Sequence, residues 1–334
     1  MPESVPLMKT VIILGGTSHI AKGLIGRFLK QPDFRIEWFG RSAERMEAFL
    51  DSEQLSGNIA VHGGYEDFFS VRCDALINCV GAGTPDKLKD DYTLWFFVLE
   101  KYDNLCLDYL KQINPAALYV DFSSGAIYGR DPGGTGYRID PNRIQPPDYY
   151  ALAKLYSEAK HRANLDLNIV DIRIFSYFSR YADPDSGYLM TDILKAVLKH
   201  DVLKTTGQDL VRDYISPDDL FALIQCCQAR PKINTAFDAF SRKPASKLEI
   251  LSAFQEKFGL RTEIADLGSG SPNSTASVYI PRNHTAETIG FKPRFTALDG
   301  LIRETDAAVD SKHSGYHAYD VTEKQSNPGK SSEK

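Results

Sequence analysis

A short apolar segment, a glycine turn and an amphipathic segment follow one another near the start of the chain. Residues 10–14 (TVIIL) are apolar or β-branched without a break, as in a strand buried on both faces of a parallel sheet. After Gly15 and Gly16, apolar residues recur at helical spacing as far as Pro32, which ends the predicted helix. A buried strand that turns tightly into a helix is typical of a dinucleotide-binding βαβ unit.

The same alternation continues through the first half of the chain. Further strands are predicted at 35–39, 59–61, 75–80, 117–122 and 167–175, with helices at 42–50, 88–112 and 149–163. Strands that alternate with helices imply right-handed crossovers. The sequence therefore predicts an α/β fold with a Rossmann-type, doubly wound parallel sheet.

The alternation weakens after residue 176. Helices are predicted at 188–200, 215–228 and 248–259, and the last residues are polar and rich in Pro, Gly and Ser. We expect a cofactor-binding Rossmann domain at 8–175, a smaller C-terminal substrate lobe mainly at 176–305 and a disordered tail at 310–334. Segments from about 212–240 are expected to return to the main sheet.

Charge and cysteine usage limit the class of protein. The net charge of -5 gives no support for nucleic-acid binding. The five cysteines include no C-x-x-C pair and several lie in apolar runs, so we expect free thiols in a reducing compartment, the cytoplasm. We see no signal peptide and no apolar run long enough to span a membrane. The histidines are scattered, so we expect no metal site.

The glycine turn suits a pyrophosphate. Gly15 would supply the tight turn, and the backbone N–H groups of Thr17, Ser18, His19 and Ile20 would point at the phosphates from the positive end of a helix. Later glycine positions of the fingerprint hold Ser18 and Ala21. The pattern is thus incomplete, and a plain strand–helix turn is the alternative.

The end of the second predicted strand indicates which dinucleotide binds. Sites that prefer NAD usually carry Asp or Glu there, about 20 residues after the glycine turn. This chain reads FGRS instead, and Arg41 and Ser42 suit a 2′-phosphate. The alternative for Arg41 is a solvated charge at a strand end. We expect NADP(H) as the preferred cofactor of the 8–175 domain, with NAD(H) as the second choice.

Three residues carry the chemistry. Tyr150 and Lys154 are four apart, which places them on one face of a helix, and an ammonium stabilises a neighbouring phenolate. Such a tyrosine can exchange a proton with a carbinol or carbonyl oxygen while hydride passes to or from nicotinamide. Ser124, at the end of a predicted strand, can polarise the same oxygen. A surface pair is the alternative for Y-x-x-x-K alone, but the order of the three motifs favours catalysis.

Over roughly residues 10–305 the chain resembles the extended short-chain dehydrogenase/reductases, in the NAD-dependent epimerase/dehydratase group that includes UDP-galactose 4-epimerase. The motifs are LGGTSHIA, DALINCVGA, FSSGAIYG, YALAK, RIFSYFS, RDYISPDDL and GFKPRFTALDGL. The resemblance implies Tyr150 as the acid/base, Lys154 as the modifier of its acidity and a ligand of the nicotinamide ribose, and Ser124 as the oxyanion partner.

The resemblance also implies further binding residues. It implies cofactor contacts from Gly64, Tyr65, Cys79, Gly81, Tyr150, Lys154 and Phe175, and substrate contacts from Ser124, Ser176 and Arg212. Arg212 matches a position that grips a diphosphate, and an ion pair with Asp213 or Asp219 is the alternative. Ser176 stands where many members have Asn. Members of the group are often homodimers, so a homodimer is expected.

One departure from the motifs of the group argues against a dehydratase reaction. The 4,6-dehydratases of the group carry an Asp-Glu pair just after the active-site hydroxyl residue, whereas this chain has Gly125 and Ala126 after Ser124. We therefore expect reduction of a keto group on a nucleotide-activated sugar, of the 4-ketoreductase type. A nucleotide-sugar 4-epimerase with tightly bound NAD(P) is one alternative. A non-catalytic dinucleotide-sensing protein is another, because a fold alone does not fix a function.

Overall fold

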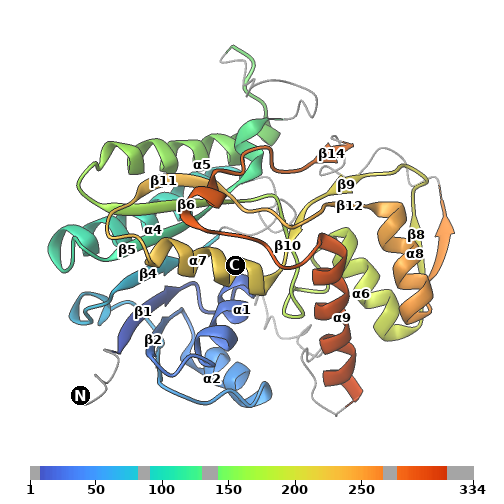
Figure 1. The fold of residues 1–334 in the computed structure, drawn as a ribbon, viewed down its shortest axis with the longest axis horizontal. Helices are drawn as coiled ribbons and strands as arrows, with labels where there is room; N and C mark the ends of the chain where they lie inside the picture. The colour runs from blue at the N-terminus through green and yellow to red at the C-terminus, as the bar shows by residue number, and fades with distance from the viewer. Residues whose placement is uncertain (1–7, 82–90, 130–141, 266–276, 314–334) are drawn as a thin grey trace, which may run out of the picture.

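The computed structural model describes residues 8–81, 91–129, 142–265 and 277–313, and its main element is a seven-stranded sheet (Figure 1). The strands run in the order β11-β6-β5-β4-β1-β2-β3, and all neighbours are parallel. They are β1 (Lys9–Leu14), β2 (Phe34–Phe39), β3 (Ile59–His62), β4 (Ala75–Asn78), β5 (Leu118–Ser124), β6 (Asn168–Ile174) and β11 (Asn234–Asp238). The order reverses between β1 and β4, which confirms the doubly wound Rossmann-type sheet.

Helices cover both faces of this sheet. One face packs against α1 (His19–Phe28), α2 (Ala43–Ser52) and α7 (Pro217–Gln228), and the other against α4 (Thr93–Gln112) and α5 (Pro146–Ala163). Successive strand residues point to opposite faces, so Val11 and Ile13 join the first core while Ile12 and Leu14 join the second. All four side chains are fully buried, which explains the unbroken apolar run in the sequence.

A second group of elements lies beside the sheet and has its own apolar core (Figure 1). It contains α6 (Leu189–Lys199), β8 (Val202–Thr205), α8 (Lys247–Phe258), β13 (Arg261–Ile264) and α9 (Ala297–His313). Short strands form two small sheets near it: β7 (Ser176–Tyr177) with β10 (Tyr214–Ile215), and β9 (Val211–Arg212) with β12 (Ala245–Ser246) and β14 (Val278–Tyr279). The 3₁₀ turns are η1 (Phe68–Ser70), η2 (Gly125–Tyr128) and η3 (Thr285–Ile289).

Helix ends follow the local chemistry of the sequence. Ser42 and Ser216 cap α2 and α7, and each side chain accepts a hydrogen bond from the backbone N–H three residues on. Gly259 ends α8 in the left-handed region, with φ of 66°. The tail begins later than residue 310, because α9 continues to His313, with Ala308 buried in the second core. Residues 314–334, where the rest of the tail was expected, lie outside the described residues.

In the described part of the chain, no helix is both long and apolar enough to cross a membrane. All five cysteines are free thiols, as expected.

Candidate active site

The predicted site residues follow the strands of the main sheet. Gly15 follows β1, Arg41 follows β2, Cys79 follows β4 and Phe175 follows β6, while Ser124 is the last residue of β5. Since these strands are parallel, their carboxyl ends lie at one edge of the sheet. In open α/β sheets, ligands bind at this edge, next to the point where the strand order reverses.

The glycine turn packs directly on the end of β4. Gly15 has a φ of 83°, and a Cβ built on it would lie 2.7 Å from the carbonyl carbon of Cys79. Any side chain would therefore meet backbone atoms, in addition to the strain of a left-handed conformation. Glycine is required here because the turn and β4 touch at the reversal point of the sheet.

The first turn of α1 offers N–H groups to an anion, with one change from the sequence prediction. The N–H of Ser18 donates to the Gly15 carbonyl at 2.9 Å, and its hydroxyl accepts from Ala21 N at 3.1 Å, so Ser18 shapes the turn and does not offer its amide. Within the described residues, the N–H groups of Thr17, His19 and Ile20 have no acceptor. These three amides fit the needs of a pyrophosphate at a helix N-terminus.

His19 adds no charge to this turn. Burial, together with nearby Lys22, lowers the pKa of His19 to about 4, so its ring is neutral at physiological pH. The ring packs edge-on against Tyr177, with 5.1 Å between centroids. The side chain of His19 therefore fills space behind the turn.

Arg41 and Tyr65 lie near each other beyond β2 and β3. Arg41 is exposed, and the Ser42 hydroxyl accepts from Arg45 N at 3.3 Å as the cap of α2. The Tyr65 ring, which follows Gly64, lies 6.3 Å from the ring of Phe39 at the end of β2, and it interacts electrostatically with Arg41. An exposed guanidinium beside a capped helix can bind a phosphate group.

Cys79 and Gly81 follow β4. Burial raises the pKa of the Cys79 thiol well above its ordinary range, so the side chain is a neutral thiol. Gly81 is exposed, and no atom lies within 4 Å of a Cβ built on it. Cys79 can therefore form a wall of the site, and it is no acid catalyst at physiological pH.

The three residues predicted to carry the chemistry lie at β5 and α5. The Ser124 oxygen accepts from Ala126 N at 3.1 Å, which leaves its proton to donate. The ring of Tyr150 is half-buried and packs against Trp95 with centroids 5.5 Å apart. Lys154 lies one turn further along α5 and is buried, and its ammonium donates to the Phe122 carbonyl at 2.5 Å.

Neighbouring groups keep the Lys154 side chain protonated. Burial alone lowers the pKa of Lys154, but the carboxylate of Asp121 and the neighbouring Tyr150 outweigh burial and raise it. Its Nζ lies 3.7 Å from Asp121 Oδ2. The ammonium form is therefore maintained at the floor of the site at physiological pH.

Tyr279 on β14 is a site residue that the sequence analysis missed. Its ring centroid lies 5.0 Å from that of Phe175, and its hydroxyl interacts with Ser124. Burial raises the pKa of Tyr279, so it is a neutral phenol at physiological pH. No motif marks this residue, because β14 has two residues and its place in the fold depends on long-range pairing with β9.

The same pairing brings Arg212 toward the site. Arg212 is the partner of Tyr279 across the β9–β14 pair, and its guanidinium carbon lies 5.9 Å from the Tyr279 ring centroid. The carboxylates of Asp213 and Asp219, which were the alternative partners, accept instead from the backbone N–H groups of Ser241 and of Arg294 and Phe295. Ser176 is half-buried in β7, beside β10.

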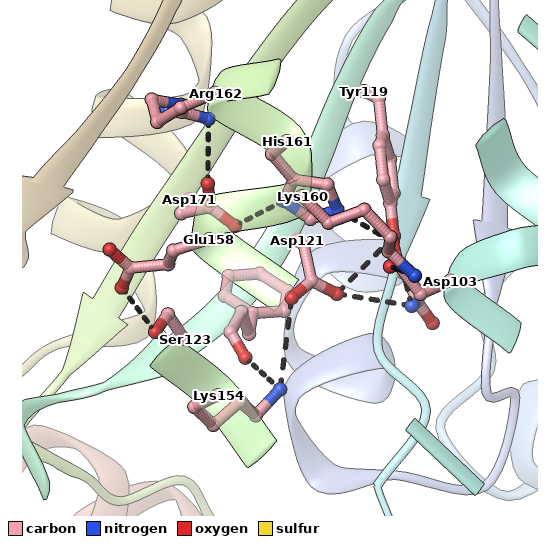
Figure 2. Close-up of polar contacts among 12 residues, drawn as sticks. Asp103, Tyr119, Asp121, Ser123, Lys154, Glu158, Lys160, His161, Arg162 and Asp171 are labelled. Carbon is pink, nitrogen blue, oxygen red and sulfur yellow. Dashed lines mark hydrogen bonds and ion pairs between the residues drawn. The ribbon is translucent and has the colours of Figure 1, made fainter. Parts of the chain in front are cut away.

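A buried charge network lies behind Lys154 (Figure 2). His161 on α5 is fully buried, and its two ring nitrogens lie 2.6 Å from Asp103 Oδ1 and 2.7 Å from Asp171 Oδ1. Burial alone lowers the pKa of His161, but the bonds to Asp103 and Asp171 outweigh burial and raise it to about 10. His161 is thus an imidazolium at neutral pH. Within the described residues, no cluster of His, Cys, Asp and Glu could hold a metal ion.

Neither family models nor curated protein sequences match this chain. Solved structures match it in fold along most of its length. A UDP-glucose 4-epimerase from Stenotrophomonas maltophila, with bound NAD and formylated UDP-arabinopyranose, has a TM-score of 0.75 at 16% identity and covers 92% of this chain and 99% of its own. A UDP-glucuronic acid 4-epimerase from Bacillus cereus, with UDP-glucuronic acid and NAD, has a TM-score of 0.71 at 17% identity and covers 90% and 99%.

A dTDP-glucose 4,6-dehydratase from Bacillus anthracis in complex with NAD is also similar, with a TM-score of 0.70 at 15% identity over 92% of this chain and 98% of its own. The chain therefore shares its fold with these two epimerases and this dehydratase. This likeness confirms the fold that the sequence motifs predict.

Replacement of His161 by Gln is expected to change how stability depends on pH. Because the folded pKa is raised from 6.5 to about 10, the imidazolium contributes stability that is complete below the first value and lost as pH rises through the second. Wild-type protein should lose up to about 1.4 kcal/mol of unfolding free energy per pH unit in that window through this group, and His161→Gln should not. Urea unfolding across this window measures both slopes.

The matched control is His200→Asn, at an exposed position in the left-handed region after α6. It should keep the wild-type slope. Equal slopes for wild type and His161→Gln would show that the buried imidazole is neutral and would contradict the network as described.

Proposed function

We propose that this protein is an NADP(H)-dependent oxidoreductase that reduces a keto group of a nucleotide-activated sugar, with Ser124, Tyr150 and Lys154 as its catalytic residues. The observation that supports the proposal is that these three side chains lie near one another: Lys154 interacts electrostatically with Tyr150, and Tyr279 interacts with both Ser124 and Tyr150. Structures of the same fold contain NAD together with UDP-sugars.

The geometry supports a defined role for each catalytic residue. When bound, the reduced nicotinamide supplies a hydride to the carbonyl carbon of the sugar. Tyr150 donates its hydroxyl proton to the carbonyl oxygen, and Ser124 donates a hydrogen bond to the same oxygen. The Lys154 ammonium stabilises the phenolate that Tyr150 then carries. Lys154 also donates to the Phe122 carbonyl and pairs with Asp121 at 3.7 Å, and both contacts hold the ammonium in position.

Binding roles follow from position along the carboxyl edge. The amides of Thr17, His19 and Ile20 are proposed to bind the pyrophosphate, and Arg41 with Ser42 the 2′-phosphate of NADP(H). The second group of elements is proposed as the substrate lobe. The remaining proposed cofactor contacts are Gly15, Ser18, Gly64, Tyr65, Cys79, Gly81 and Phe175, and the proposed substrate contacts are Ser124, Ser176, Arg212 and Tyr279.

A nucleotide-sugar 4-epimerase is the second candidate, because two of the structures of this fold are 4-epimerases and the same three residues would serve. An epimerase returns the hydride to its substrate and keeps its cofactor. The epimerase is favoured if the protein purifies with one dinucleotide per chain, epimerises a nucleotide sugar and causes no net oxidation of NADPH.

A non-catalytic dinucleotide sensor is the third candidate. Such a protein would bind the cofactor and turn over no sugar.

We propose the cytoplasm as the location, in keeping with five free thiols.

Purified protein is expected to oxidise NADPH when given nucleotide-linked 4-keto-6-deoxy sugars, with loss of absorbance at the nicotinamide band. Tyr150→Phe should lower the rate at least about 100-fold, because the proton donor is lost, and should change NADPH affinity far less, because the ring is kept. The control is Tyr149→Phe, whose ring packs against Tyr92 and Phe96. If no substrate in the panel consumes NADPH, the reductase proposal fails. A fully active Tyr150→Phe would refute the catalytic role of this residue.

Arg41→Ala is expected to weaken NADPH binding about tenfold or more and to leave NADH binding unchanged, because only NADPH carries the 2′-phosphate. Titration calorimetry with both cofactors measures the two affinities. Arg230→Ala, an exposed position before β11, serves as the control and should change neither affinity. Equal weakening of both cofactors by Arg41→Ala would contradict a 2′-phosphate contact.

We propose a homodimer that forms through α4 and α5, whose outer surfaces expose Phe96, Phe97, Leu155 and Tyr156. Phe97, the most exposed of these at 65%, is the side chain to change. Sedimentation should show a dimer for wild type and a monomer for Phe97→Glu, since burying a carboxylate in an apolar interface is costly. Leu165→Glu, at a position that is 75% exposed after α5, should remain dimeric. A monomeric wild type would disprove this proposal.

A further inference from the structure

Three buried polar residues lie side by side on the face of the sheet that α4 and α5 cover. Strand register places Asn78 of β4 beside Asp121 of β5, and Asp121 beside Asp171 of β6. All three are at most 4% exposed. A row of this kind is costly to bury unless each group has a partner, so the partners of each carboxylate indicate its purpose (Figure 2).

Two carboxylates of the network have cations of their own. Asp103 on α4 lies 2.5 Å from Lys160 Nζ and 2.6 Å from His161 Nε2. Asp171 lies 2.7 Å from His161 Nδ1 and 2.7 Å from Arg162 Nη2. Asp103 and Asp171 thus each have ion-pair partners other than Lys154.

Asp121 differs from these two carboxylates. Its Oδ1 accepts from Asn78 Nδ2 at 3.0 Å and lies 3.4 Å from the Tyr119 hydroxyl, and both groups are neutral. Lys154, 3.7 Å away, is the one cation within ion-pair distance of Asp121 in the part of the chain that the structure describes. Within the described residues, the ammonium of Lys154, the proposed catalytic lysine, is therefore the counter-ion of Asp121.

The ammonium of Lys154 is in turn directed by Asp121. The ammonium donates one hydrogen bond, to the Phe122 carbonyl at 2.5 Å, and forms an ion pair with Asp121 Oδ2 at 3.7 Å. The groups that act on it from the elements packed around it are Asp121 of β5, Tyr150 of its own helix, Asp171 of β6 and Asp103 of α4. Since Asp171 and Asp103 are neutralised locally, Asp121 is the carboxylate that acts on Lys154 most directly.

We propose that Asp121 is a positioning residue, the dedicated counter-ion that holds Lys154 as an ammonium in one place beneath Tyr150. Asn78 links this pair to the glycine turn, because its Oδ1 accepts from Val80 N at 3.1 Å, just beyond Cys79, against which Gly15 packs. The effect of this pair on the pH dependence of kcat rests on the proposed function. The ion pair itself can be tested without any substrate.

The first test follows the titration of Lys154 by NMR. Protein labelled with ¹³C at lysine Cε is titrated with base, and the Lys154 resonance is assigned by its loss in Lys154→Met. In Asp121→Asn the midpoint should fall by at least about one pH unit, because burial of the ammonium is then opposed by less negative charge. Asp108→Asn, an exposed carboxylate on α4, should leave the midpoint unchanged. An unchanged midpoint in Asp121→Asn would overturn the proposal.

The second test is a double-mutant cycle in urea. Lys154→Met leaves Asp121 buried and unmatched, so its unfolding midpoint should fall. The double variant Lys154→Met with Asp121→Asn should recover part of this loss, and it should fold even if Asp121→Asn alone does not. A double variant that is as unstable as the two losses added together would show that Asp121 acts independently of Lys154 and would refute the pairing.

A third measurement connects the pair to turnover. The alkaline limb of the pH profile of kcat should move to lower pH in Asp121→Asn and stay in place in Asp108→Asn. A merely structural role for Asp121 would lower kcat equally at every pH, and that result would refute the positioning role. If no nucleotide sugar reacts, the proposed function fails while the NMR and urea results still decide the ion pair.

Discussion

The parallel register of β4, β5 and β6 is the constraint on which the candidate site depends. It aligns Asn78, Asp121 and Asp171 in one buried row, and buried carboxylates persist only when they are paired. The helix that covers this row supplies the pairing cations. Lys154 and His161, seven residues apart, lie on one face of α5 and both reach into the row. The helix that carries the proposed acid/base is therefore placed by charge in addition to apolar contact.

A second polar row strengthens this attachment one pleat further along the strands. Ser123 of β5 and Asp238 of β11 are both register partners of Arg173 on β6. Glu158 of α5 accepts from the Ser123 hydroxyl at 2.6 Å and pairs with Arg173 at 2.6 Å. The two rows attach α5 at two successive levels along the same face of β5, the strand that ends in Ser124.

The sequence was sufficient to predict the sheet, most helices and the three proposed catalytic residues. Alternating apolar runs and helical periodicity determine the order of elements, and parallel strands bring Gly15 and Ser124 to one edge even though they are far apart in the chain. The serines that cap α2 and α7 and the glycine after α8 are local signals, which is why these helices begin and end close to their predicted bounds.

Contacts that depend on the register between strands could not be predicted from the sequence. A single Asp inside YVDF or IVDI indicates a buried charge, but only strand pairing shows that Asp121 and Asp171 are neighbours. His161 was one of several scattered histidines, and its two carboxylate partners come from α4 and β6. Tyr279 reaches the site through a two-residue strand. The Ser18 amide is used inside the turn, which no residue pattern reveals.

The charged residues on the sheet-facing side of α5 limit which parts of the candidate site can change. Apolar burial is non-directional, whereas ion pairs have fixed partners, and a slide of α5 would separate Lys154, Glu158 and His161 from their partners together. The side of the candidate site that carries the proposed acid/base is thus a fixed block. If the proposed function holds, a change of substrate is easier at the opposite wall, where β7, β9 and β14 are strands of two residues each.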